Sequence, residues 1–350
     1  MRIVGVESFT RPEVALVRVR TDEGIEGWGQ VAPHALGRDA LDIDSFVDSL
    51  PELEHKFHGS HLYRALAGVD TALWDVRGKL EGKGVSELLG GERRSLPAYA
   101  SSMRRDITPE AEAERLLRER DEHGYRAFKV RIGKECGHDA DEWPGRTEAL
   151  VPHVRRAIGD EAALLVDANS CYSPARAIEV GHLLADNGVS HFEEPCPHWN
   201  LDWTREVTEA LELDVAGGEQ DWDERVWQSM VDTRVVDVVQ PDVCYVGGLT
   251  RALRVARLAA ARGMPCTPHS ATLSLVLVFA LHLLAALENP GKYVEFSIEP
   301  DDDYPWQVAM YEPRPTVVDG FVDVPDGPGW GVAISPDWLA RSEHRETWLD

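Results

Sequence analysis

The chain has 350 residues, of which 43% are apolar, and it carries a formal net charge of −25. This length allows a large buried core, enough for a barrel of about 250 residues together with a smaller module. A strongly negative protein repels polyanions, so we expect no nucleic-acid partner. No apolar run approaches the roughly 18 residues of a membrane span, and the first residues lack a signal-peptide core. We therefore expect a soluble, cytoplasmic protein with no membrane partner.

The first part of the chain, residues 1–95, is predicted to be a separate α+β module. Its segments IVGVESFT and VALVRVRTDEGIEGWGQ are typical of antiparallel strands joined at turns. The later segment HLYRALAGVDTALWDVRGKLEG has apolar residues near helical spacing, which predicts a helix with a buried face. The residues after about 305 are rich in Gly, Pro and Asp, and we expect them to form turns and short strands that pack back on this module.

The middle of the chain alternates short apolar runs with helical patterns, which is typical of a parallel α/β barrel. In such a barrel the C-terminal ends of all strands lie on one rim, and active sites are built there. The predicted strands cover residues 96–102, 127–133, 164–170, 191–195, 214–220, 237–242, 265–270 and 293–297.

Three acidic residues in this region, Asp167, Glu193 and Glu219, follow one another at intervals of 26 residues, each near the end of an apolar run. One carboxylate per βα unit would bring all three to the same rim. Hard carboxylate oxygens, with no Cys or His among them, suit Mg²⁺ better than zinc. The spacing therefore predicts a site for one Mg²⁺ per subunit. Glu194 is an adjacent candidate ligand, but the spacing favours Glu193.

A series of motifs in this order resembles the enolase superfamily and, within it, the mandelate racemase subgroup. The resemblance spans nearly the whole chain. It implies a modified (β/α)7β barrel over residues 96–305, with an α+β capping domain formed by residues 1–95 and about 306–350. It also implies a homo-oligomer and a Mg²⁺-assisted removal of the proton next to a carboxylate. The motifs are ALAGVDTALWDVRGKLEGKGVSELLGG, YRAFKVRIG, LLVDANSCY, HFEEP, GGEQ, VVQPDVCYVGGLT, TPHS and YVEFS.

The resemblance also implies roles for three residues on the last predicted strands. His269 matches the catalytic base and Asp242 its orienting partner, since a carboxylate on one ring nitrogen fixes the tautomer. The structural alternative is a core histidine satisfied by a backbone carbonyl. Glu295, if protonated, would donate a hydrogen bond to the second oxygen of the substrate carboxylate, and its alternative is an ordinary salt bridge.

The second predicted barrel strand departs from the subgroup. Racemases there often carry Lys-x-Lys, whose second Lys is a base on the opposite face of the substrate, whereas this chain has Lys129 and Arg131. Arginine does not readily give up its proton and is a poor general base. Racemisation needs proton transfer on both faces, so Arg131 favours a one-base elimination. Lys129 and Arg131 would then neutralise the substrate carboxylate and the enediolate, or merely balance the acidic rim.

Four further residues are candidates for binding a polyhydroxylated anion. The structural alternative for Asn169 is that it only holds its turn, and for the loop histidines that they are solvated. The four residues are Asn169, His34, His58 and His198.

The sequence thus predicts a Mg²⁺-dependent dehydratase that acts on a small-molecule carboxylate. The substrate is expected to be an aldonate, an aldarate or a related hydroxy acid, and the product a 2-keto-3-deoxy acid. The first alternative is an epimerase or racemase of the same fold, in which Lys129 is the second base. A metal-dependent aldolase and a non-catalytic barrel protein are further alternatives.

Overall fold

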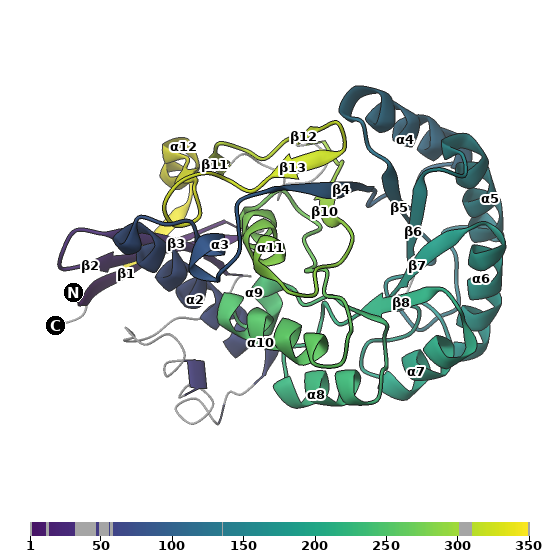
Figure 1. Ribbon diagram of the computed structural model, residues 1–350, viewed down its shortest axis with the longest axis horizontal. Helices are drawn as coiled ribbons and strands as arrows, with labels where there is room; N and C mark the ends of the chain where they lie inside the picture. The colour runs from purple at the N-terminus through teal and green to yellow at the C-terminus, as the bar shows by residue number, and fades with distance from the viewer. Residues whose placement is uncertain are drawn as a thin grey trace.

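The computed structural model describes residues 2–11, 14–31, 47–48, 56, 59–134, 136–300 and 310–348. Figure 1 shows a barrel of parallel strands ringed by helices, with a smaller mixed module at one side where both chain ends lie. Among the described helices, none combines the length and apolar character that a membrane span needs.

The smaller module is a four-stranded antiparallel sheet covered by one long helix. Its strand order is β15-β1-β2-β3, so the last described strand pairs with the first. The helix and β3 lie so close that a Cβ atom at Gly27 would stand 2.1 Å from the carbonyl oxygen of Ala72. Glycine in β3 is therefore what lets the sheet pack directly on the helix. The elements are β1 (Ile3–Thr10), β2 (Ala15–Thr21), β3 (Glu26–Val31), α2 (Ser60–Glu81) and β15 (Glu343–Trp348).

The barrel strands follow one another in sequence order, and β10 pairs with β4 in parallel. Residues 265–269 lie between β9 and β10 and make single bridges, from Cys266 to Val239 and from His269 to Asp242. The predicted fold, a modified α/β barrel with an N-terminal capping module, is thus confirmed. The strands are β4 (Ser95–Ser101), β5 (Ala127–Arg131), β6 (Ala163–Asp167), β7 (Val189–Glu193), β8 (Asp214–Gly217), β9 (Val238–Val239) and β10 (Val294–Ser297).

Two predicted strands are wrong in extent. The segment 265–270 makes only isolated bridges, and the strand predicted at 237–242 shrinks to two residues. Pro265 and Pro268 in the first segment, and Pro241 in the second, have no N–H group to donate to a strand ladder. The bridge between Asp242 and His269 nevertheless keeps these two residues side by side.

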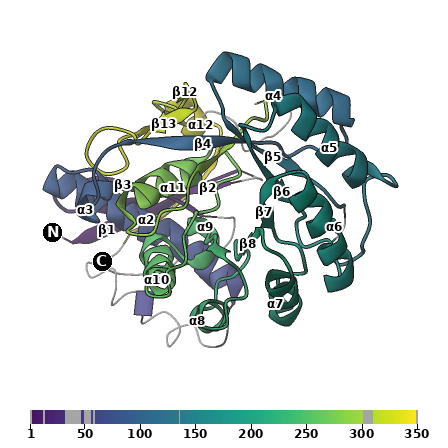
Figure 2. The same ribbon diagram turned by 45° about the vertical axis from the view of Figure 1, so that its right-hand side comes forward.

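Helices surround the barrel and, for the most part, bury one face against it (Figure 1). The exception is α11, which is buried almost all round because it contacts both β10 of the barrel and β3 of the small module (Figure 2). Helix α3 (Val85–Leu88) belongs to the small module and contacts α2 and α11. The other helices are α4 (Pro109–His123), α5 (Arg146–Ile158), α6 (Pro174–Asp186), α7 (Leu201–Ala210), α8 (Glu224–Asp232), α9 (Val243–Val246), α10 (Leu249–Ala260) and α11 (Leu275–Ala286).

The residues after 310 return to both parts of the molecule. Strand β13 pairs antiparallel with barrel strand β4, whereas β15 joins the sheet of the small module. The tail therefore packs on the barrel as well as on the N-terminal module, and the domain boundary near residue 306 stays a prediction. The elements of the tail before β15 are β11 (Tyr311–Glu312), β12 (Val317–Val318), β13 (Phe321–Asp323), β14 (Ala333–Ile334) and α12 (Pro336–Ala340).

A buried histidine on α11 joins the tail to the small module. The Nδ1 atom of His282 accepts a hydrogen bond from the Ser86 N–H at 3.1 Å, and its Nε2 atom lies 3.2 Å from the Trp330 carbonyl oxygen. The ring must therefore be neutral, with its proton on Nε2. Burial lowers the pKa of His282 to about 4.

Because of His282, we expect the folded protein to lose stability in mild acid. A histidine in the unfolded chain takes up a proton near pH 6.5, whereas folded His282 does so only near pH 4. Its contribution to the free energy of unfolding is therefore full above about pH 6.5 and falls by about 2 kcal/mol between pH 7.5 and pH 5. Urea unfolding at both pH values should show a smaller drop for His282→Gln than for the wild type. Equal drops in the two proteins would contradict this role.

Candidate active site

A cavity of about 420 Å³ lies at the C-terminal ends of the barrel strands, where the barrel faces the small module. Gln30 and Val31 of β3 contribute to its wall from the module side. The barrel contributes most of the remaining wall, including all of its described charged residues. These are Arg105, Arg131, Glu219, Asp242 and His269.

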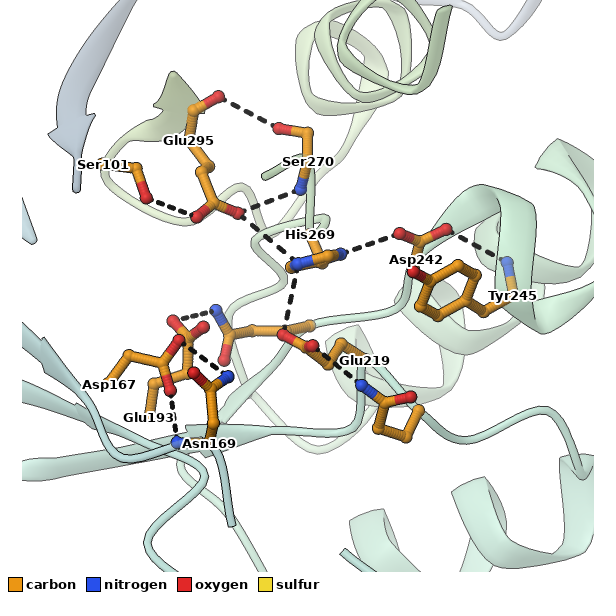
Figure 3. A network of polar contacts seen from close by, with 12 residues as sticks. Ser101, Asp167, Asn169, Glu193, Glu219, Asp242, Tyr245, His269, Ser270 and Glu295 are labelled. Carbon is orange, nitrogen blue, oxygen red and sulfur yellow. Dashed lines mark hydrogen bonds and ion pairs between the residues drawn. The ribbon is translucent and has the colours of Figure 1, made fainter. Parts of the chain in front are cut away.

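The three predicted metal ligands lie on neighbouring strand ends (Figure 3). Asp167 ends β6 and Glu193 ends β7, the two residues are in register, and both are fully buried. Glu219 lies two residues beyond the end of β8 and is 5% exposed. The turn from the end of β8 to Glu219 depends on Gly218. Its φ is +105°, and a Cβ atom there would stand 2.3 Å from the Trp227 ring. The structure thus brings all three carboxylates to one part of the rim.

Two buried cations stand among these carboxylates. The Lys129 Nζ atom lies 2.8 Å from Glu193 Oε1 and 2.7 Å from Glu295 Oε1, and the Arg131 guanidinium pairs with Asp167 at 2.5 Å. Burial alone would lower the pKa of Lys129, but the carboxylates of Glu193 and Glu295 outweigh it and raise the pKa well above its usual range. Lys129 therefore keeps its proton. It is also fully buried and does not belong to the described lining of the cavity.

Glu295 is held by hydrogen bonds and by an ion pair. Its carboxylate accepts hydrogen bonds from Ser101 Oγ at 2.8 Å and from the Ser270 N–H at 3.0 Å, in addition to its ion pair with Lys129. Burial raises the pKa of Glu295, but the Lys129 ammonium outweighs that effect and holds the pKa at about 2. In this arrangement the Glu295 carboxylate only accepts hydrogen bonds, which agrees with the alternative of a salt bridge, and its role toward the substrate stays a prediction.

His269 and Asp242 form a hydrogen-bonded pair in which each residue is fixed. His269 Nδ1 lies 2.7 Å from Asp242 Oδ2, while Asp242 Oδ1 accepts hydrogen bonds from the N–H groups of Cys244 and Tyr245 at the start of α9. The partner of the imidazole is thus a carboxylate and not a backbone carbonyl. The other ring nitrogen, Nε2, lies 3.3 Å from Glu219 Oε2 (Figure 3).

The carboxylates around His269 control its protonation. Burial alone would lower the pKa of His269, but the charge of Glu219 and the hydrogen bond to Asp242 raise it to about 10. A cation held by Glu219 would oppose this rise, because it repels a proton on the neighbouring ring. The ring is therefore placed where a bound cation would keep it unprotonated and so available to accept a proton.

Negative charge at the rim exceeds what the protein itself balances. Burial and neighbouring carboxylates raise the pKa of Glu219 to about 7 and that of Glu194 well above its usual range. In the part of the chain that the structure describes, Glu194 Oε1 has no hydrogen-bond partner, and Glu219 Oε2 makes no hydrogen bond beyond its contact with His269 Nε2. Burial of such carboxylate oxygens is unfavourable unless a cation or further hydrogen-bond donors are present.

The donor set fits Mg²⁺, although Asp167, Glu193 and Glu219 are not close enough together here to share one ion. Glu193 is held by Lys129 and by the Gln240 amide at 2.9 Å, while Asp167 is held by Arg131. The three residues nevertheless offer buried, hard carboxylate oxygens on adjacent strand ends, and Mg²⁺ prefers such ligands. They would be the residues that hold the ion.

Comparison with known families gives two matches that together cover most of the chain. The family described as "Enolase C-terminal domain-like" matches residues 111–338, and the mandelate racemase / muconate lactonizing enzyme N-terminal domain matches residues 3–90. The protein belongs to the enolase superfamily. Within it, the N-terminal match places the protein with the mandelate racemase and muconate lactonizing enzymes.

Two characterised relatives of this enolase-superfamily protein are enzymes of sugar-acid chemistry. D-galactarolactone cycloisomerase of Agrobacterium fabrum is 32% identical, over 95% of this chain and 92% of the relative. Arabinonate dehydratase of Saccharolobus solfataricus is 28% identical, over 92% of this chain and 88% of the relative. The shared length covers both the barrel and the capping module.

Solved structures agree with the fold over its whole length. A protein of Roseobacter denitrificans, provisionally named a racemase, has a TM-score of 0.96 and 54% identity, with 100% of both chains covered. A mandelate racemase/muconate lactonizing protein of Paracoccus denitrificans PD1222, complexed with magnesium, has a TM-score of 0.84 and 28% identity, covering 99% of this chain and 98% of the other.

Asn169 lines the cavity of this enolase-superfamily protein and also holds its own turn. Its backbone N–H donates to Asp167 Oδ1 at 2.7 Å, in a turn where Asn169 has φ +42°. Its side-chain oxygen accepts hydrogen bonds from both Arg131 and Arg105. Asn169 thus holds its turn and positions two guanidinium groups at the cavity, whereas its hydrogen bond to substrate stays a prediction.

Of the three predicted substrate-binding histidines, the structure describes only His198. His198 is half-buried, packs edge-on against the Trp199 ring, and does not belong to the described lining of the cavity. The expectation for His198 is therefore not supported. His34 and His58 lie outside the described residues.

Several lining residues were missed at the level of sequence, among them Arg105, Tyr245 and Gln30. Arg105 follows the first barrel strand, and its Nε atom donates to the Gly133 carbonyl oxygen at 2.9 Å. Its position just beyond a strand end was a usable signal, because barrel sites are built from such loops. Tyr245 lies under the Arg64 guanidinium, 3.5 Å from the ring centroid, and Gln30 reaches the wall from another domain. No local sequence pattern indicates that Tyr245 or Gln30 lines the cavity.

Proposed function

We propose that this protein is a Mg²⁺-dependent dehydratase of a sugar acid or a related hydroxy acid. The observation that carries the proposal is that the described lining of the cavity has a single imidazole base, His269, backed by Asp242. The second barrel strand offers Lys129, enclosed between two carboxylates, and Arg131, which cannot act as a base. One base supports an elimination, whereas racemisation needs proton transfer on both faces of the substrate.

In the proposed reaction, His269 Nε2 takes the proton next to the substrate carboxylate. Asp242 keeps the Nδ1 proton in place and stabilises the imidazolium that forms. The same ring then gives that proton to the β-hydroxyl, which leaves as water from the same face, and the resulting enol rearranges to a 2-keto-3-deoxy acid. Arg131 and Arg105, joined through Asn169, supply positive charge beside the substrate carboxylate.

The metal is part of the proposal. Asp167, Glu193 and Glu219 would hold Mg²⁺, which when bound stabilises the negative charge that develops on the substrate carboxylate. The magnesium complex of the relative from Paracoccus denitrificans supports this choice of ion. A small carboxylate as substrate and a homo-oligomeric assembly, which the family resemblance implies, belong to the same proposal.

Two relatives give alternatives. The relative from Agrobacterium fabrum is named a cycloisomerase of a lactone, and a sugar-acid lactone also carries a weakly acidic proton beside its carboxyl group. His269 could serve that reaction without a second base. The relative from Roseobacter denitrificans is provisionally named a racemase, but a buried, protonated Lys129 argues against a second base here.

Incubation of the enzyme with Mg²⁺ in D₂O separates these functions. Aldonates, aldarates and their lactones would each be followed by NMR and by a colorimetric assay for 2-keto acids. We expect a keto acid with deuterium at C3 from an open-chain acid. Deuterium at C2 with inverted configuration and no keto acid would show a racemase. Turnover restricted to lactones would show a cycloisomerase, and two carbonyl fragments would show an aldolase.

A further inference from the structure

Glu194 directly follows the predicted ligand Glu193, and its backbone has an unusual conformation. Successive side chains of a strand point to opposite faces, so regular continuation of β7 would turn Glu194 away from Glu193. Instead Glu194 has φ +42°, which non-glycine residues rarely adopt. Its N–H donates to the Ala216 carbonyl oxygen at 2.9 Å and its carbonyl oxygen accepts from the Ser170 N–H at 2.7 Å. Both neighbouring strand ends therefore hold this conformation in place.

The side chain of Glu194 is buried without adequate partners. It is 5% exposed, and its Oε1 atom has no hydrogen-bond partner among residues 2–348 as far as the structure describes them. The groups that act on its charge most strongly are the carboxylates of Glu219, Asp167 and Glu193. Burial of a carboxylate among other carboxylates is unfavourable unless a cation or hydrogen-bond donors compensate.

The cations nearest to this rim are already engaged. Lys129 is paired with Glu193 and Glu295, and Arg131 is paired with Asp167. The His269 ring, whose charge also acts on Glu194, lies against Asp242 and Glu219. The unpaired oxygen of Glu194 therefore lacks a donor that the described protein can supply. Mg²⁺ in proteins usually keeps several water molecules, and each of them is a strong hydrogen-bond donor.

We propose that Glu194 is a positioning residue for the divalent cation. Its carboxylate accepts hydrogen bonds from water molecules on the Mg²⁺ ion that Asp167, Glu193 and Glu219 hold. The inference rests on the metal site of the proposed function, but it assigns Glu194 a role in affinity for the ion and none in the proton transfer. Groups that support metal ligands in this way typically change the affinity for the ion by about 10–100-fold when they are removed.

The test is the binding of Mg²⁺ alone, measured by isothermal titration calorimetry without substrate. Glu194→Gln keeps the shape of the side chain and removes its charge, so we expect the Kd for Mg²⁺ to rise at least about 10-fold. Its Tm in EDTA should stay the same or rise, because one charge leaves a cluster of like charges. Glu194→Asp keeps the charge on a shorter side chain, and its Kd should lie between the two.

Glu112→Gln is the matched control. Glu112 on α4 is 1% exposed and lies outside the site; its two side-chain oxygens also lack hydrogen bonds, although Arg115 lies 3.7 Å from one of them. Its substitution should leave the Kd unchanged. A wild-type Kd in Glu194→Gln would overturn the role of Glu194, and so would a fall in its Tm in EDTA, which shows a structural role. Absence of Mg²⁺ binding in the wild type would overturn the metal site as a whole.

Discussion

Replacement of His269 by Asn is expected to lower kcat by about 10²–10⁴-fold while Mg²⁺ still binds. The amide of Asn can still donate a hydrogen bond to Asp242, but it cannot accept the proton from the substrate. The Asp242 carboxylate stays fixed by the N–H groups of Cys244 and Tyr245. The measurements are steady-state kinetics with the acid identified in the D₂O screen and calorimetric titration with Mg²⁺.

A second buried histidine provides the control for this variant. His282 lies on α11 and touches Ser86 and Trp330, away from the cavity. His282→Gln should keep its kcat at pH 7.5, where the folded protein predominates. Wild-type turnover in His269→Asn would remove His269 from the role of base. Exchange of the α-proton in D₂O should be lost together with turnover, because both depend on the same proton transfer.

The substitution Lys129→Met is expected to lower the free energy of unfolding by about 3–5 kcal/mol in EDTA. The Lys129 ammonium is fully buried and pairs with both Glu193 and Glu295. Its removal leaves two carboxylates buried without their cation, which costs far more than the loss of an exposed ion pair. Urea unfolding followed by circular dichroism measures the change.

A second substitution at Glu295 and a substitution at an exposed lysine, Lys83, test the cause of this loss. Lys129→Met combined with Glu295→Gln should recover part of the lost stability, because one of the two unpaired charges is then gone. Lys83→Met breaks an exposed contact with Glu81 at 3.5 Å and should change stability by less than about 1 kcal/mol. If Lys129→Met also lowered the free energy of unfolding by less than about 1 kcal/mol, water would be replacing the ammonium group, and the expectation would be wrong.

The fold could be predicted well because its main signals are local. Each barrel strand is a short apolar run that ends in a polar turn, and the motifs follow one another in chain order. The segment 265–270 failed because Pro265 and Pro268 interrupt the backbone ladder while leaving the apolar pattern intact. The pattern of apolar residues indicates which segments are buried. The length of a strand also depends on backbone N–H groups that can donate hydrogen bonds.

The sequence predicted which residues form the site, but not which of them make ion pairs with one another. The spacing of Asp167, Glu193 and Glu219 places one carboxylate on each strand end, and the structure agrees with that placement. The enclosure of Lys129 between Glu193 and Glu295 arises from strands β5, β7 and β10, which meet only when the barrel closes. No local pattern in the sequence predicts such a contact, and for this reason the salt bridge of Glu295 could be given only as an alternative.

The pairing of β15 with β1 has a consequence for the order of assembly. Strand β1 is synthesised before the other described strands, yet one of its edges stays open until β15 has been made, after the barrel strands. The sheet that carries Gln30 and Val31 to the cavity is thus finished by the last described strand. A nascent chain presents an unpaired edge strand throughout synthesis, which is a state prone to association with other chains. The charged residues of β1 and β2, Glu7 with Arg18 and Arg20, lie on that sheet and would discourage such contacts.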